Sequence, residues 1–153
     1  MIDYPNKIVV ILRVLEVIEE RQRDLDQQVT ELKDALLSDT KSSAGDKHET
    51  SRAMTQLEQE KLGKQIGELN QLKSNFLRIN RDEAHQIIQL GSLILTSEGF
   101  YYLSIPLGKI TLTNEIEVFC LSPISPLGQL LKGKKEGEVI TFNNRMIRID
   151  SVN

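Results

Sequence analysis

The chain has 153 residues, a formal net charge of −3, 39% hydrophobic residues and 5% aromatic residues without tryptophan. This hydrophobic content is modest for one compact core built from the whole chain, so a small domain with an elongated helical arm is expected. Interspersed acids and bases with a slightly negative total argue against a general affinity for nucleic acid or anionic membranes.

The apolar stretch near the N-terminus, IVVILRVLEVI, is interrupted by Arg13 and Glu16. It is too short and too charged to span a bilayer, and it lacks a small-residue cleavage site. We therefore expect a cytoplasmic protein without membrane contact. Cys120 is the single cysteine and lies in the apolar run IEVFCLSP, which predicts a buried, unreactive thiol.

Residues 6–44 contain neither proline nor the helix-weakening residue glycine. Apolar side chains recur in this segment in alternating steps of four and three, with one polar place at Gln22. Such spacing is a heptad seam, and it predicts a long helix that packs along one narrow stripe. The apolar seam residues are Ile11, Leu15, Ile18, Leu25, Val29, Leu32 and Leu36.

A second helical pattern follows the polar connection LLSDTKSSAGDK, although Gly63 and Gly67 weaken its middle. A short connection between two long heptad helices favours an antiparallel hairpin. We place this coiled-coil hairpin at residues 1–80, with a polar, acidic tip near residues 41–50. The expected apolar stripe of the second helix consists of Met54, Leu57, Leu62, Ile66, Leu69, Leu72, Phe76 and Ile79.

The period changes to that of strands in the last part of the chain. GSLILTSEGFYYLSI predicts a hairpin that turns at Ser97–Gly99, and NEIEVFCL predicts a central strand. EVITF and RMIRID are expected to be strands joined by the turn Asn143–Asn144, whose residues tolerate positive φ. A short helix should begin near Ser125-Pro126 and end at Gly133. Residues 81–153 are thus expected to form a small antiparallel β domain with one helix, which makes the fold class α+β.

Two carboxylates at the tip, Asp46 and Glu49, are the candidates for chemistry. D-x-x-E before a helix is also a capping box, in which Asp46 would cap the helix and Glu49 would reach back. As metal ligands the pair is incomplete, because Mg²⁺ takes a near-octahedral set of oxygen ligands, so another molecule would have to supply the rest. His48 does not complete a trio, because positions 46 and 48 are about 200° apart around a helix.

Other catalytic signatures are scarce in the sequence. It has no glycine-rich phosphate loop, no Cys/His metal cluster and no G-x-S-x-G nucleophile turn. We therefore expect that the chain is not an enzyme by itself. A cluster of basic residues, Lys132, Lys134 and Lys135, is consistent either with a partner contact or with a solvated loop.

Two segments resemble the Gre transcript-cleavage factors of bacterial RNA polymerase. AGDKHETSRAM (residues 44–54) resembles the family's tip, G-D-x-x-E-N-A-E-Y, and LSPISPLGQLLKGKKEGEVITF (residues 121–142) resembles its C-terminal signature. In that signature a Ser-Pro segment leads into a short helix, and G-K-K-x-G-D follows before a strand. The two segments occur in the family's order, and the expected architecture is also that of the family.

The resemblance implies a transcription elongation factor with an FKBP-like C-terminal domain that docks at the rim of the polymerase secondary channel. Its coiled coil would enter the channel and approach the 3′ end of the nascent RNA. Asp46 and Glu49, which match the tip aspartate and glutamate, would help to hold a catalytic Mg²⁺ shared with the polymerase active centre. The polymerase would then cleave backtracked transcripts. An FKBP-like fold does not imply prolyl isomerase activity, because the few aromatic residues make an aromatic-lined proline pocket unexpected.

The tip departs from the family pattern after Glu49. Thr50 replaces the family's asparagine, and Arg52 and Ala53 stand at the places of its next acid and its tyrosine. These changes leave open an alternative, a channel-binding regulator that inhibits transcription without stimulating cleavage. A coiled-coil adaptor whose tip acids only cap a helix is a third hypothesis. We expect a monomer, with an intermolecular coiled coil through the first helix as the alternative.

Overall fold

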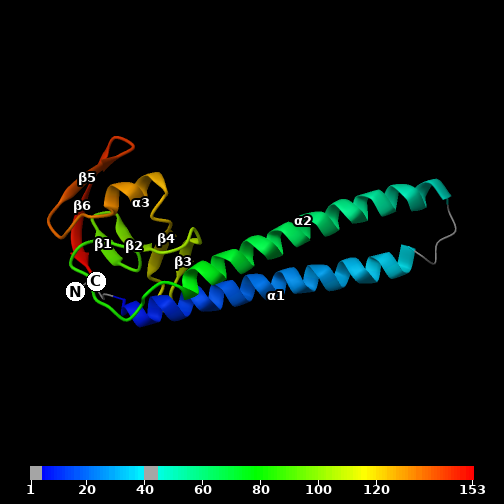
Figure 1. The fold of residues 1–153 in the computed structure, drawn as a ribbon, viewed down its shortest axis with the longest axis horizontal. Coiled ribbons are helices and arrows are strands. Elements are labelled where there is room, and N and C mark those ends of the chain that lie inside the picture. Colours follow the sequence, from blue (N-terminus) through cyan, green and yellow to red (C-terminus); the bar gives the residue numbers. More distant parts are fainter. Residues whose placement is uncertain (1–4, 40–44) are drawn as a thin grey trace. The chain divides into compact units, whose positions relative to one another are not determined.

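The structure, a computed structural model, describes residues 5–39 and 45–153. Two long helices precede six strands and one short helix (Figure 1). The elements are α1 (Lys7–Asp39), α2 (Gly45–Leu77), β1 (Leu93–Thr96), β2 (Gly99–Leu103), β3 (Gly108–Thr111), β4 (Glu117–Leu121), α3 (Pro126–Leu131), β5 (Val139–Phe142) and β6 (Arg145–Val152).

The chain divides into two compact units. The hairpin unit is Ile18–Lys73, and the sheet unit combines the described part of Met1–Val17 with Ser74–Asn153. Compactness therefore groups the first turns of α1 and the last turn of α2 with the sheet. The boundary predicted near residue 80 marks a different feature, the change from helical to strand periodicity.

The predicted seam of the first helix accounts for the burial pattern in the hairpin unit. Between residues 19 and 38, every side chain is exposed except four that are partly buried, and all four belong to the predicted seam. Facing residues of α2 include the buried Leu62 and Leu69. A narrow stripe of this kind is sufficient for an antiparallel pair of helices, because each helix buries only one line of side chains. The four seam residues are Leu25, Val29, Leu32 and Leu36.

The predicted apolar stripe of the second helix is wrong at two residues. Met54 and Leu57 are both 67% exposed, whereas Ser51 and Thr55 are partly buried in their neighbourhood. Ser51, Thr55 and Leu62 continue the three-and-four spacing back from the buried part of α2, so the seam there is polar. A pattern search that follows only apolar residues leaves the helix face at this point.

The sheet unit contains one six-stranded sheet in the order β3-β4-β2-β1-β6-β5. The predicted turn at Ser97–Gly99 joins β1 to β2, and Asn143 and Asn144, with φ of 49° and 62°, join β5 to β6. Central placement of the NEIEVFCL strand is confirmed, because β4 lies between β3 and β2. The sheet is mixed rather than wholly antiparallel, since β2 and β4 run parallel. Strand β3 was not predicted.

Both faces of this sheet are covered. Alternation places Leu103 and Leu121 on the face that packs against α3, where they join a core that includes Leu131. Tyr102 and Cys120 point to the opposite face, and the Tyr102 ring meets Phe76 of α2 edge-to-face at 6.3 Å between centroids. Cys120 is 1% exposed, which confirms the predicted buried thiol.

The predicted fold class, an α+β protein with a long helical hairpin followed by a small β domain with one short helix, is confirmed. The FKBP-like character of the β domain stays a prediction. Within residues 5–39 and 45–153, neither long helix has a stretch apolar enough to span a membrane.

Candidate functional site

The carboxylates predicted at the tip belong to the first turn of α2. The helix begins at Gly45, so Asp46 is its second residue and Glu49 its fifth. The predicted cap by Asp46 depends on a side chain that lies outside the described part of the structure, so it stays a prediction. The remainder of the predicted tip, residues 40–44, and the side chains of residues 45–48 lie outside the described part of the structure.

Positions 46 and 49 both lie within α2, three residues apart. Residues three apart on an α-helix are neighbours on its surface, and the N-terminal end of a helix stabilises negative charge. Glu49 is exposed, as a residue that reaches toward another molecule must be. The 24 residues between Glu49 and the end of the hairpin unit at Lys73 correspond to about 36 Å of helix.

The donor set suits a hard cation but does not complete its coordination. Carboxylate oxygens are the ligands that Mg²⁺ prefers, and Asp46 and Glu49 supply two such groups. In the part of the chain that the structure describes, no group of three His, Cys, Asp or Glu side chains is placed to hold a metal. Two carboxylates are a partial ligand set for Mg²⁺, and their role as metal ligands stays a prediction.

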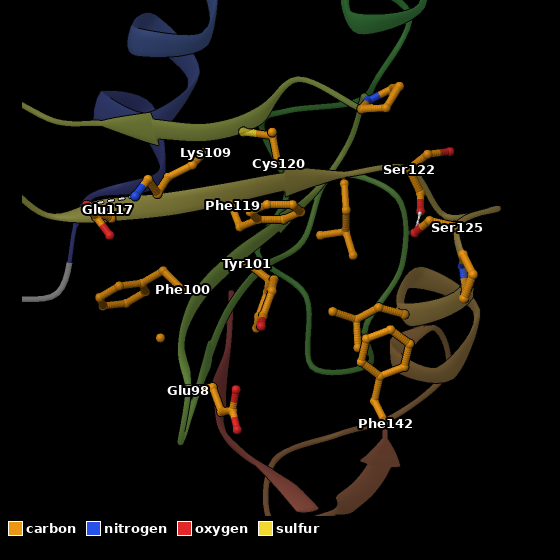
Figure 2. A pocket seen from close by; sticks show the side chains of 16 residues that line it. Glu98, Phe100, Tyr101, Lys109, Glu117, Phe119, Cys120, Ser122, Ser125 and Phe142 are labelled. Carbon is orange, nitrogen blue, oxygen red and sulfur yellow. Dashed lines mark hydrogen bonds and ion pairs between the residues drawn. The ribbon is translucent and has the colours of Figure 1, made fainter. Parts of the chain in front are cut away.

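A second candidate site is an apolar pocket on the α3 face of the sheet unit, which sequence reasoning did not predict (Figure 2). Its volume is about 680 Å³, within the range of small-ligand and peptide pockets. Tyr101 and Phe119 come from the parallel strands β2 and β4, and their rings meet edge-to-face at 6.1 Å. Phe142 approaches from the end of β5, and Leu127 comes from α3. Aromatic residues therefore line a pocket in the sheet unit, whereas the absence of prolyl isomerase activity stays a prediction.

The charged groups around this pocket are paired with one another. Arg145 forms an ion pair with Glu98 at 2.9 Å, and Lys109 forms one with Glu117 at 3.2 Å. Burial, with a smaller contribution from the nearby Glu98 carboxylate, raises the pKa of Tyr101, so its phenol stays protonated. The pocket thus offers a mainly apolar surface with a hydroxyl group and paired charges among its lining residues, suited to a mainly apolar partner.

The Ser-Pro signature folds into a tight loop beside the pocket. Ser125 O–H donates to Ser122 O at 2.6 Å, and Ser125 Oγ accepts the Gly128 N–H at 3.1 Å, so Ser125 caps α3 at the predicted start of the short helix. Pro126 follows at the first helical position, where its missing N–H is not needed. This rigid loop presents Ile124, whose side chain is 80% exposed.

The predicted basic cluster does not form a strongly charged surface. Lys132 and Lys135 are exposed, whereas Lys134 is only partly exposed and its carbonyl accepts the Ile88 N–H at 2.8 Å. Main-chain bonds at Ile88 and Gly133 therefore give this segment a structural role, because they attach the residues after α3 to the chain before β1.

Solved structures similar to this chain include two from Thermus species. GreA factor homolog 1 of Thermus thermophilus is 18% identical over 94% of this chain and 94% of that chain, with a TM-score of 0.34. Gfh1 of Thermus aquaticus is 19% identical over 88% of this chain and 92% of that chain, also with a TM-score of 0.34. No family model and no curated protein matches the sequence. A likeness at this identity and TM-score says nothing about the function of this chain.

Proposed function

We propose that this protein is a Gre-like transcription elongation factor that binds bacterial RNA polymerase and inserts its helical hairpin into the secondary channel. There it stimulates cleavage of backtracked transcripts by the polymerase. The observation that carries this proposal is the carboxylate pair Asp46 and Glu49 in the first turn of α2, in a chain whose Ser-Pro segment caps α3. Both motifs support the proposal through their resemblance to the Gre factors.

Asp46 and Glu49 would provide oxygen ligands at the polymerase active centre. A Mg²⁺ ion bound there would lower the pKa of an attacking water and orient it for in-line displacement at phosphorus. The role of this chain is to carry two negative charges to that place on a helix end that stabilises them. Because its own ligand set is incomplete, the isolated protein is proposed to hydrolyse no RNA.

The sheet unit would anchor the protein on the polymerase. Its apolar pocket, lined by Tyr101, Phe119 and Phe142, lies beside the loop that presents Ile124. Apolar pockets with aromatic walls contribute much of the binding energy in protein interfaces, because they remove large apolar side chains of the partner from water. We therefore assign the docking contact to this pocket and loop.

The proposal is tested with purified protein and stalled, backtracked elongation complexes of the cognate polymerase. Asp46→Ala and Glu49→Ala should abolish stimulated cleavage while polymerase binding stays near the wild-type level. Glu58→Ala is the matched control, since Glu58 is an exposed glutamate further along the same helix. Wild-type protein that leaves these transcripts uncut at saturating concentration would rule out the cleavage function.

Residues 50–53 favour a second candidate, a channel-binding inhibitor. Arg52 and Ala53 are exposed on the turn that follows Glu49, where the family has an acid and a tyrosine. A positive charge beside the two carboxylates weakens their attraction for a cation. An inhibitor would bind the polymerase and slow elongation without cleavage in the same assay. Arg52→Glu combined with Ala53→Tyr should then increase cleavage, whereas a cleavage factor would show it already in the wild type.

A further inference from the structure

Residues 80–92, which join α2 to β1, are held against the sheet unit by main-chain hydrogen bonds. We call this segment the strap. Gly91 N–H donates to Leu103 O at 2.7 Å, and Leu103 N–H donates to Ser92 O at 3.0 Å. Gly91 has φ of +94°, and a Cβ there would lie 3.0 Å from Asn80 O. The end of the strap is therefore packed closely onto its own beginning.

His85 lies inside this closed loop and is only 7% exposed. Its Nδ1 is 2.8 Å from the hydroxyl of Ser92, which is fully buried. Ser92 Oγ also accepts the Gln89 N–H at 3.0 Å, and the imidazole tautomer decides whether Ser92 donates to Nδ1 or accepts from it. A neutral imidazole thus completes a chain of hydrogen bonds from Gln89 through Ser92 to His85.

Charged groups reach His85 from two elements. Lys7 of α1 is 6% exposed, and its ammonium donates to Glu83 O at 2.7 Å and to Asn153 O at 3.3 Å. Glu83 of the strap contributes the opposing negative charge. Burial, followed by the Lys7 ammonium, lowers the pKa of His85, and the Glu83 carboxylate raises it by a smaller amount. The closed strap therefore holds a neutral histidine beside a buried cation.

We propose that the attachment of the strap to the sheet unit is acid-sensitive, and that protonation of His85 releases residues 85–92 from the sheet unit. A second positive charge beside Lys7 in this buried place is unfavourable, and opening the strap lets water solvate it. The release needs no partner, so the proposal is independent of the transcriptional function. It gives the connection between α2 and β1 two states that differ by one proton.

The direction of the pH dependence follows from linkage. His85 of the open strap has the ordinary pKa of 6.5, and the pKa of the closed form is lower. The stability of the closed form is therefore complete above about 6.5. It declines as the pH falls below that value, because the open form then binds more protons.

Amide hydrogen exchange monitored by NMR tests whether the attachment of the strap is acid-sensitive. In the wild type, the protection factors of Gln89, Gly91 and Ser92 should fall by up to about tenfold between pH 7.5 and 5.5, as one linked proton requires. His85→Gln keeps a neutral side chain with hydrogen-bonding groups and should remove this pH dependence. Equal falls in wild type and His85→Gln, or no fall in the wild type, would overturn the proposal.

A titration of the imidazole signals keeps the test valid if His85→Gln does not fold. The chain has two histidines, so His48→Gln leaves a single signal, that of His85. Its midpoint should lie below 6.5 and move upward when Lys7→Met removes the neighbouring cation. A midpoint at 6.5 or above, or one that Lys7→Met does not move, contradicts the proposed acid-sensitive attachment of the strap.

Discussion

The ammonium of Lys7 donates a hydrogen bond of 2.7 Å to the main-chain carbonyl of Glu83, across 76 positions of the sequence. A second bond of 3.3 Å reaches the carbonyl of Asn153, so one lysine joins the first turn of α1 to the strap and to the residue after β6. Burial lowers the pKa of Lys7, and the nearby Glu83 carboxylate raises it by a smaller amount. The lysine therefore links three segments of the sheet unit through its hydrogen bonds.

Replacing this lysine should destabilise the protein. Lys7→Met keeps an unbranched apolar stem but leaves two carbonyls without their donor, so the free energy of unfolding should fall by about 1–3 kcal/mol. Chemical denaturation followed by circular dichroism measures the change. Lys109→Met is the control, because Lys109 forms an exposed ion pair with Glu117 and its loss should cost under about 1 kcal/mol. Equal stability of Lys7→Met and wild type would contradict the role assigned to Lys7.

The hydroxyl of Tyr102 predicts an effect of the opposite sign. It is buried, and no residue of the described part of the chain accepts or donates a hydrogen bond to it. Burial raises the pKa of Tyr102 strongly, so the phenol stays neutral. Tyr102→Phe removes the unpaired group and keeps the ring contact with Phe76, so the protein should be more stable by about 1–3 kcal/mol. Thermal unfolding measures it, and a lower melting temperature would show that the hydroxyl has a partner.

How far sequence reasoning reached depended on the range of the interactions. The seam of α1, the start of α3 near Ser125 and the Asn143–Asn144 turn are local patterns, and each was predicted because it depends on neighbouring residues only. Met54 and Leu57 were misplaced because the seam continues through Ser51 and Thr55. A polar residue in a seam cannot be recognised by its hydrophobicity.

Long-range pairing explains the rest. The parallel contact of β2 with β4, and β3 beside it, were missed because the pattern of one strand does not show the direction of its neighbour. That contact also places Tyr101 next to Phe119 and thereby creates the pocket. Its aromatic residues were visible in the sequence, but their convergence was not. Asp46 and Glu49 were found from a motif, and their role stays a prediction.

Two glycines give a matched test of local packing. A Cβ on Gly128 would lie 2.1 Å from the carbonyl oxygen of Ser122, inside the loop that Ser125 closes. Gly128→Ala should therefore destabilise the sheet unit by at least about 1–3 kcal/mol, since the clash is with the main chain. Gly63 of α2 has open space around it, so Gly63→Ala should stabilise the protein by about 0.5–1 kcal/mol. Denaturation midpoints that fail to move in opposite directions would contradict this account.

The last prediction separates docking from stability at the apolar pocket. Phe119 is 45% exposed, so Phe119→Ala should change the free energy of unfolding little, whereas it removes an aromatic wall of the pocket. If the sheet unit docks on RNA polymerase through this pocket, the dissociation constant should rise about tenfold or more, as for a central aromatic contact. Met146→Ala is the control, because Met146 is 73% exposed and does not line the pocket. Fluorescence anisotropy with labelled protein measures both affinities. An unchanged affinity of a folded Phe119→Ala variant would exclude this pocket as the docking surface while leaving the tip carboxylates to be judged by the cleavage assay.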